Sequence, residues 1–367
     1  MDRVKPVGLR TRPRVSVVVT CYNYGAYLHD AVTSALDQSG IDVEVIIADN
    51  GSTDDSREVA EKLAAADPRV QVYTQPENIH PLHNFNQRLE LATGDYVQIL
   101  CADDILTTDS LTRAVAVMEA RPDVVYTYGS CPPFDGAPPT FTPAEVSSWT
   151  IWDGTEWVKG RYRAGTNPFY HPEVLMRTET MRSVGWYNPN YRLTSDMLLW
   201  MQAALRGNVA RVNGPDQAFY RKHGKNLHMQ INGNGWMRDF ESRQAVFDVL
   251  PELAPESALG PDDIDASRRA LALDAAKYAC MALSSTDPET RSIGADYADY
   301  AAQTWPAITS SLRWRTIRSA IDRDSRLGPR VWFKADVNYR NIESHIGRTS
   351  RFNREPVWDR IRSRAHI

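Results

Sequence analysis

Cysteine is scarce in this chain of 367 residues, and the few cysteines present form no close pair. They are Cys21, Cys101, Cys131 and Cys280, and no CxxC spacing joins any two of them. A disulfide framework and a zinc site built on paired cysteines are therefore disfavoured. Free thiols are typical of a reducing compartment, so we expect a cytoplasmic protein.

Long apolar runs are also missing. No segment approaches the ~20 consecutive apolar residues that a membrane-spanning helix requires. The N-terminal stretch MDRVKPVGLRTRPR is basic, but no apolar stretch follows it as in a secretory signal. No GxGxxG follows a predicted strand, which disfavours a dinucleotide-binding dehydrogenase or a methyltransferase. We therefore expect a soluble chain.

Neither sign of charge dominates, because the formal net charge is −4. This charge argues neither for nor against a nucleic-acid partner, and we expect none. The distribution is uneven, however: residues 311–367 carry 14 Lys and Arg against 6 Asp and Glu. Such a basic end suits an anionic partner, for example a phosphate group, a membrane surface or another chain. The alternative is a solvated helical surface, because charged side chains are mostly exposed.

Strand and helix patterns alternate in the first part of the chain. The β-branched runs VSVVVT at 15–20 and VEVIIA at 43–48 predict buried strands, and helical spacing follows each of them, at 26–38 and 54–66. Further strands are predicted at 70–74, 96–100, 124–128, 209–212 and 218–220, and further helices at 83–92, 107–120 and 194–206. Repeated strand–helix units predict an α/β fold with a mixed, mostly parallel sheet and helices on both faces.

The rest of the chain differs in character. Residues 131–191 are rich in proline and tryptophan and predict irregular loops and short strands. Strand patterns fade from about residue 226, and the helices predicted beyond it lie at 236–250, 266–283, 293–305 and 311–322. We expect an N-terminal tail at 1–12, a first domain at 13–230 and a mainly α-helical domain at 231–367.

Polar clusters stand where three of the predicted strands end. They are TCYN at 20–23, DNGSTD at 49–54 and the pair Asp103 and Asp104. In a parallel sheet these ends lie at one edge, where ligands bind. Each cluster alone is a weak signal, because Asn-Gly and Asp or Ser favour turns and caps. The adjacent carboxylates of Asp103 and Asp104 repel each other, so they need solvent or a cation.

Together, the clusters resemble a known family. The stretches VSVVVTCYNYGAYLHDAVTSALDQ, VEVIIADNGSTDDS and GDYVQILCADD are similar to the nucleotide-sugar-binding half of the family 2 glycosyltransferases, which have the GT-A fold. The resemblance is strong over residues 14–128, extends loosely to 223 and does not reach the C-terminal third. It implies an inverting transferase that uses a nucleotide-diphosphate sugar, commonly UDP-linked, and a divalent cation, Mn²⁺ or Mg²⁺.

The resemblance assigns roles on the donor side of the site. Thr20 and Tyr22 would line the base and ribose pocket, and Asp49 would accept a hydrogen bond from the pyrimidine ring. Asp103 resembles the acid that binds the ribose. Asp104 resembles the acid that binds the metal, which fits the preference of hard cations for oxygen ligands.

Other donor-side positions are less clear-cut. Cys101 stands where many relatives carry a further acid, so metal binding would rest on fewer carboxylates. Asn86 matches an Asn that lines the donor. Arg221 and His223 lie in YRKHGK, which is similar to a family loop that closes over the diphosphate; an exposed basic loop is the alternative.

The acceptor side needs a base, because the attacking hydroxyl loses its proton as it displaces the leaving group. Asp196 in TSDMLLW resembles the family's acid at the start of an apolar helix, with Ser195 in place of a further acid. A helix N-terminus lowers the pKa of an Asp, which would keep Asp196 ionised; helix capping without chemistry is the alternative. His171 and Trp152 are candidates for acceptor contact, with plain packing as the alternative.

Two other functions stay open as alternatives. A sugar nucleotidyltransferase on a similar fold is disfavoured, because TCYNYG lacks the Gly-rich basic loop of that class. A non-catalytic nucleotide- or glycan-binding relative is kept open by Cys101 and Ser195, which replace acids. The acceptor is not predicted, and the C-terminal helices could shape its pocket, form a homodimer or contact a membrane surface.

Overall fold

The computed structural model describes residues 1–142, 144–167, 169–224, 237–256 and 258–346, and within 337–346 only the course of a helix. The described chain divides into two compact units. The first takes residues 1–158, 167–224 and 248–259, and the second takes 159–166, 237–247 and 260–346. The predicted domain boundary between 230 and 231 lies outside the described residues and stays a prediction.

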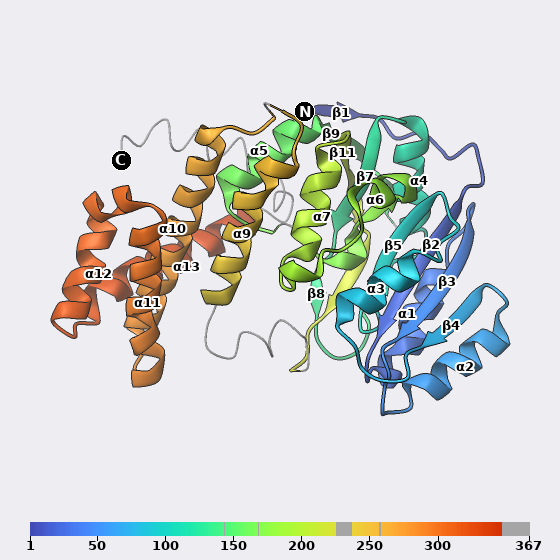
Figure 1. Cartoon of the computed structure of the whole chain (residues 1–367), viewed down its shortest axis with the longest axis horizontal. Helices are drawn as coiled ribbons and strands as arrows, with labels where there is room; N and C mark the ends of the chain where they lie inside the picture. Colours follow the sequence, from blue (N-terminus) through green and yellow to red (C-terminus); the bar gives the residue numbers. More distant parts are fainter. Residues whose placement is uncertain (143, 168, 225–236, 257, 347–367) are drawn as a thin grey trace. The chain divides into compact units, whose positions relative to one another are not determined.

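The first unit is built on a nine-stranded mixed sheet (Figure 1) with strand order β1-β9-β11-β7-β10-β5-β2-β3-β4. Its parallel core consists of β2 (Arg14–Cys21), β3 (Asp42–Asp49), β4 (Val70–Thr74) and β5 (Tyr96–Cys101). The other strands are β7 (Val124–Ser130), parallel to β11 (Asn208–Asp216), and the antiparallel β1 (Asp2–Val4), β9 (Ser148–Trp152) and β10 (Leu175–Arg177). A second, three-stranded sheet joins β6 (Ile105–Leu106), β12 (Ala218–Arg221) and β8 (Pro133–Phe134).

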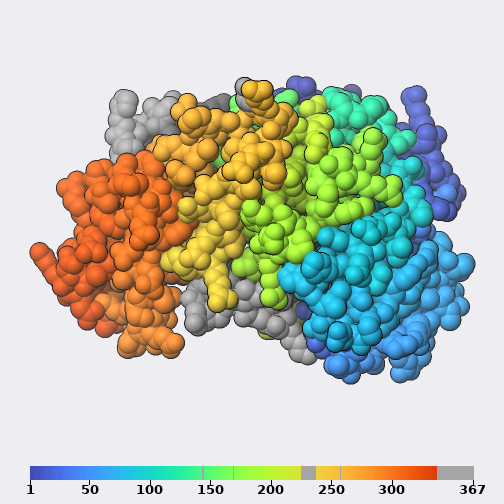
Figure 2. All heavy atoms as spheres, in the orientation of Figure 1, coloured from blue at the N-terminus to red at the C-terminus, as the bar shows by residue number. Residues whose placement is uncertain are grey.

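Helices cover both faces of the large sheet. The helices of the first part of the chain are α1 (Gly25–Leu36), α2 (Ser56–Ala66), α3 (Pro81–Leu89) and α4 (Ser110–Ala120). Val17 of β2 shares one buried cluster with Leu28 of α1 and Val115 of α4. Helices α3, α6 (Thr178–Val184) and α7 (Ser195–Ala204) lie over the other face, toward the viewer in Figure 1, and their side chains form its surface in Figure 2. Because both faces are covered, the central strands are continuous apolar runs, as predicted.

The prediction of irregular loops and short strands at 131–191 was partly wrong. This segment contains α5 (Gly154–Ala164) and α6 as well as short strands. Trp157, Val158 and Tyr162 are buried on α5. Trp157 is thus part of the apolar face of a helix, whereas Trp149 and Trp152 lie in β9.

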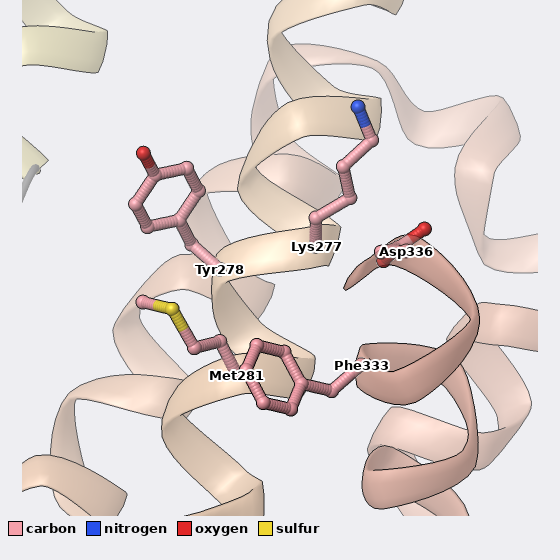
Figure 3. A pocket seen from close by; sticks show the side chains of 5 residues that line it. All are labelled: Lys277, Tyr278, Met281, Phe333 and Asp336. Atoms are coloured by element: carbon pink, nitrogen blue, oxygen red, sulfur yellow. The ribbon is translucent and has the colours of Figure 1, made fainter. Parts of the chain in front are cut away.

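The second unit is helical. It contains parts of α5 and α9 (Met237–Leu253), and α10 (Pro261–Ser284), α11 (Pro288–Thr304), α12 (Leu312–Asp322) and α13 (Leu327–Ile346). Ala275, Ala279 and Tyr297 are buried where α10 packs on α11. A small hollow between α10 and α13, with a volume of about 40 Å³, is lined by Lys277, Tyr278, Met281, Phe333 and Asp336 (Figure 3). It is large enough for water but not for a sugar nucleotide.

The helical C-terminal region agrees with the prediction, although α13 was not predicted. Among the helices in the described part of the chain, none combines the length and the apolar character that crossing a bilayer requires.

Candidate active site

The three polar clusters meet at the carboxyl edge of the parallel strands. The register pairs Thr20 of β2 with Ala48 of β3 on one side and with Cys101 of β5 on the other. Cys21 is paired with Asp49 in the same ladder. The residues that follow these strands therefore start from adjacent positions, as the sequence predicted.

The turn after β3 is held by its own polar side chains. Asp49 is buried, and its carboxylate accepts hydrogen bonds from the hydroxyl group of Ser52 and from the Ser52 backbone N–H, the latter at 3.3 Å. The amide of Asn50 donates to the carbonyl of Ile79 at 2.8 Å and accepts from its N–H at 3.2 Å. Gly51 has φ +72°, and an added Cβ would lie 2.5 Å from the Glu77 backbone. Asn50 and Gly51 thus fix the loop that enters α3.

A candidate cation site lies directly after β5. One ligand atom each from Cys101, Asp103 and Asp104 lies within 4.8 Å of the others. Asp104 is only 1% exposed, and its Oδ1 accepts a hydrogen bond from the backbone N–H of Arg221 at 3.0 Å. Its Oδ2 is buried and has no hydrogen-bond partner among the described residues. A buried carboxylate oxygen without a donor is costly unless a cation or a proton meets it, so the residues present fit a divalent cation.

The protonation of this cluster follows from its burial. Burial raises the pKa of Asp104, and the charge of Asp103 raises it further. Burial likewise raises the pKa of the Cys101 thiol, so the thiol stays protonated at neutral pH. A thiol is a weak ligand until it is deprotonated, so the donors are carboxylate oxygens. Such a set suits Mg²⁺ or Mn²⁺ better than a thiophilic metal.

The end of β12 closes over the two acids. His223 Nε2 lies 2.9 Å from Asp103 Oδ2, and the His223 ring stacks on Tyr27 with 5.5 Å between ring centroids. Arg221 Nε donates to the Asp103 carbonyl at 2.9 Å, and its guanidinium lies over the rings of Tyr27 and Phe134. The alternative of an exposed basic loop is therefore wrong for these two residues. A diphosphate contact of Arg221 stays a prediction, and its guanidinium is already engaged by protein groups.

The second acidic centre is Asp196, in the first turn of α7. Its Oδ2 accepts a hydrogen bond from Asn167 Nδ2 at 3.2 Å, and its Oδ1 accepts from the Met197 N–H at 2.7 Å. The N-cap position belongs to Thr194, whose side chain makes no capping hydrogen bond. Because Asp196 accepts from a first-turn N–H, capping stays an alternative to a role as base. Burial raises the pKa of Asp196 more than nearby His171 and the hydrogen bonds lower it. The expectation that the helix end would lower this pKa was wrong, because loss of solvent outweighs the helix dipole.

Two polar side-chain atoms near Asp196 make no hydrogen bond to the described residues. Asn167 Oδ1 and His171 Nε2 are buried without a hydrogen-bond partner among the described residues. The His171 ring packs near Tyr187 and Trp200, and burial lowers its pKa, so it is neutral at pH 7. A buried polar atom without a partner is costly, so both atoms suit a polar ligand group. The sequence singled out His171 but missed Asn167, although its signal was the segment NPFYHP at 167–172.

The turn that carries His171 is anchored by a buried acid. Glu173 Oε1 accepts a hydrogen bond from the Tyr170 N–H at 2.9 Å, and Gln98 Nε2 donates to the Pro172 carbonyl at 2.6 Å. Burial raises the pKa of Glu173 to about 8. Tyr170 in turn stacks on Tyr220, with centroids 4.2 Å apart. The turn at 170–173 thus contacts Asp196 through His171 and β12 through Tyr170.

The charge of Asp196 affects the pKa values of residues near the cluster after β5. The Cys101 thiol has its pKa raised by burial, by Asp104 and Asp103, and also by Asp196. Tyr187 has its pKa raised by burial and by the charge of Asp196. Asp196 therefore lies within electrostatic reach of the cluster after β5.

The other predicted site residues stay predictions. Tyr22 is exposed after β2, and Thr20 is buried beside Cys101. The Asn86 amide donates to the Tyr187 carbonyl at 2.7 Å and accepts from its N–H at 3.0 Å, which is a structural use of both polar atoms. Trp152 is 8% exposed and stacks on Tyr128 in the core, so its packing role is evident.

Comparisons with known proteins concern the first part of the chain. A family model described as Glycosyl transferase family 2 matches residues 16–182. A Nostoc sp. protein named "Uncharacterized glycosyltransferase" is 29% identical over 233 residues, which are 59% of this chain and 67% of that protein. Glycosyltransferase GlyG of Streptococcus pneumoniae is 36% identical over 112 residues, 30% of this chain and 37% of that protein. Apart from the Nostoc protein, these curated relatives are matched over less than half of their length.

Solved structures share the fold. Staphylococcus aureus TarS 1–349, in complex with UDP-GlcNAc, aligns with a TM-score of 0.59 and 16% identity over 85% of this chain and 92% of that chain. Mannosyltransferase PcManGT from Pyrobaculum calidifontis, in complex with GDP-Man and Mn²⁺, aligns with a TM-score of 0.50 and 18% identity over 90% and 86%. These structures show that the fold is a GT-A fold with a helical C-terminal region. The family model identifies residues 16–182 as a glycosyl transferase family 2 domain, and with the relatives named as glycosyltransferases it supports a glycosyltransferase enzyme.

Proposed function

We propose that this glycosyltransferase moves a sugar from a nucleotide-diphosphate sugar, UDP-linked, to an acceptor nucleophile with inversion of the anomeric centre. The observation that carries the proposal is the cluster of Cys101, Asp103 and Asp104 just after β5, in which the buried Asp104 Oδ2 has no hydrogen-bond partner among the described residues. Asp196, on α7, adds to the raised pKa of the Cys101 thiol in the same cluster. The nucleotide sugars bound by TarS and PcManGT support a donor of this class. The UDP preference rests on the motifs from 15 to 104.

The donor side is the cluster after β5. The carboxylates of Asp104 and Asp103 would hold Mn²⁺ or Mg²⁺, with the unpartnered Asp104 Oδ2 as the first ligand. When bound, such a cation neutralises the charge that develops on the leaving diphosphate. Thr20, Tyr22 and Asp49 would receive the nucleoside, because they lie at or just after the carboxyl ends of β2, which is paired with β5, and of β3, which is the next strand in the sheet.

The acceptor side is Asp196 with its two neighbours. Asp196 accepts the proton of the acceptor hydroxyl while the acceptor oxygen bonds to the anomeric carbon and the bond from that carbon to the diphosphate breaks. A raised pKa makes the carboxylate a better base near neutral pH. The hydrogen bond from Asn167 fixes the orientation of the carboxylate. His171, neutral and buried, would bind the same acceptor through Nε2.

A thermal-shift panel tests the donor assignment. UDP, GDP, CDP and ADP are added to the full chain with and without Mn²⁺, and we expect the largest rise in melting temperature with UDP plus Mn²⁺. A larger rise with another nucleotide would overturn the UDP assignment, and no response to any nucleotide would overturn the proposal. Product analysis by NMR then reads the anomeric configuration, and retention would overturn the inverting mechanism.

A further inference from the structure

Helices α12 and α13 form an antiparallel pair in the second unit. Arg313 on α12 makes an ion pair with Asp336 on α13 at 2.9 Å. Further along, the Trp332 indole N–H donates to Thr316 Oγ1 at 3.4 Å. Residue numbers that rise on one helix while falling on the other establish the antiparallel direction.

The inner sides of both helices are buried. Trp314, Ile317 and Ala320 of α12 are buried. Phe333 and Asp336 of α13 line the hollow beside α10 (Figure 3). The exposed residues of each helix lie on its side away from these contacts, and we refer to the two exposed sides together as the outer side.

That outer side carries exposed aliphatic side chains. Leu312 is 64% exposed, Leu327 is 79% exposed and Val331 is 65% exposed. Apart from Met1, no other large hydrophobic residue in the described part of the chain is exposed as much. Single exposed aliphatic residues are ordinary, but three on one helix pair form a pattern.

Cations surround these side chains. The exposed cations of the outer side are Arg315, Arg318, Arg326, Arg330 and Lys334. Two acids are exposed there as well: Asp322 pairs with Arg318 at 3.5 Å, and Asp324, in the turn that also carries Arg326, pairs with Arg291. On α13, Leu327, Arg330, Val331 and Lys334 follow the i, i+3, i+4, i+7 spacing of one helical face. We call these exposed cations of α12, α13 and the turn between them, with the three aliphatic residues, the basic–apolar face.

We propose that the basic–apolar face docks on an anionic membrane surface. Leucine and valine side chains suit the boundary between headgroups and acyl chains, and the arginines suit the lipid phosphates. This goes beyond sugar transfer, because it concerns where the enzyme works and not what it transfers.

Other occupants fit the face less well. A symmetric dimer would bring the same cations of two copies together, which is repulsive. A nucleic acid would use the arginines but has no use for Leu327 and Val331. By sequence alone, residues 347–367 carry six Arg against two acids, a composition that also favours anionic lipid.

Vesicle co-sedimentation of the full chain tests the proposal. Phosphatidylcholine vesicles are compared with vesicles that also contain phosphatidylglycerol, and we expect binding to the anionic ones only. Leu327→Ser with Val331→Ser should weaken that binding about tenfold, because two aliphatic side chains leave the interface. Arg326→Gln with Arg330→Gln should weaken it by a similar factor.

Matched controls are Leu253→Ser, an exposed leucine of α9, and Arg57→Gln, an exposed arginine of α2. Both should bind as the wild type does, and all variants should keep its melting temperature. No binding of the wild type to anionic vesicles would overturn the proposal. So would loss of binding in the arginine variant with full binding in the serine variant, which indicates a general polyanion contact. Loss of a dimer in the serine variant, without any vesicle binding, would assign the face to self-association instead.

Discussion

The two acidic centres of the first unit are built differently. After β5, Asp103 and Asp104 are adjacent, and protein donors already meet part of their charge: His223 on Asp103 and the Arg221 N–H on Asp104. At the start of α7, Asp196 stands alone and receives an amide hydrogen bond from Asn167. No guanidinium or ammonium group in the described residues forms an ion pair with Asp196.

The difference between the two centres suggests different chemical roles, cation binding for Asp103 and Asp104 and proton transfer for Asp196. Two carboxylates held together in a buried place bind a cation, because their mutual repulsion is relieved when one is present. A single carboxylate with a raised pKa and neutral neighbours gains and loses a proton easily. Burial raises the pKa in both places, so the surroundings and not burial separate the two roles.

Replacing the proposed base should have the largest effect. Asp196→Asn keeps the shape and the hydrogen-bond position but cannot accept a proton, so we expect kcat to fall about 10³-fold. Nucleotide binding should be unchanged. Glu58→Gln, which removes an exposed first-turn acid of α2, should leave kcat intact. Initial rates of sugar transfer provide the measurement, and a wild-type rate for Asp196→Asn would show that Asp196 is not the base.

Replacing the proposed metal ligand should cost somewhat less. Asp104→Asn retains an oxygen for the Arg221 N–H but loses charge at the cation site, so we expect the transfer rate to fall about 100-fold. Excess Mn²⁺ should recover part of it. Asp42→Asn, at the opposite end of the sheet, is the control. The measurement is the transfer rate as a function of Mn²⁺ concentration. If the half-saturating Mn²⁺ concentration is the same in Asp104→Asn and the wild type, Asp104 does not bind the metal.

Removing the amide beside Asp196 should produce a smaller loss and a shifted pH profile. The Asn167 N–H stabilises the charged carboxylate and so lowers its pKa. In Asn167→Ala this pKa rises, and since the base acts when ionised, the acid limb of kcat/KM moves to higher pH. We expect a rate loss of about tenfold at neutral pH. Asn190→Ala, an exposed asparagine, should keep both rate and profile, whereas an unshifted acid limb in Asn167→Ala would contradict this account.

The smallest effect concerns the turn that connects the two centres. Glu173 has a folded pKa of about 8, above its usual 4.5, so between these pH values the folded state holds a proton that the unfolded state has lost. Stability therefore falls as pH rises through this window, by at most about 1.4 kcal/mol per pH unit, and levels off above it.

Glu173→Gln removes this dependence. We expect its melting temperature to fall less steeply than that of the wild type between pH 5 and pH 8. Exposed Glu179→Gln should follow the wild type. Melting curves at four pH values are sufficient, and equal slopes for Glu173→Gln and wild type would refute the raised pKa.

Local sequence patterns predicted those parts of the site that lie at the ends of strands. The runs at 15–20 and 43–48 form β2 and β3, and the clusters after them meet at one edge because parallel strands end together. Burial by distant residues could not be predicted in this way. The sequence suggested that Arg221 lies in a loop, but in the structure its guanidinium lies over the rings of Tyr27 and Phe134, which are distant in sequence. The pKa of Asp196 likewise depends on packing that no local pattern encodes.

The helical unit was predicted in outline for a similar reason. Helical spacing identified α9 to α12, because each carries an apolar face. α13 exposes Leu327 and Val331 on one side, so its pattern did not indicate one buried face. Asn167 was missed because its partner, Asp196, is distant in sequence.

The division of labour between the centres is tested most directly by one binding measurement on two variants. Titration calorimetry measures UDP binding, with and without Mn²⁺, to Asp104→Asn and Asp196→Asn, alongside transfer rates. The account predicts that Asp196→Asn binds UDP with wild-type affinity and metal dependence but transfers almost no sugar, while Asp104→Asn loses the metal-dependent part of binding. Metal-dependent UDP binding that survives in Asp104→Asn but is lost in Asp196→Asn would contradict it.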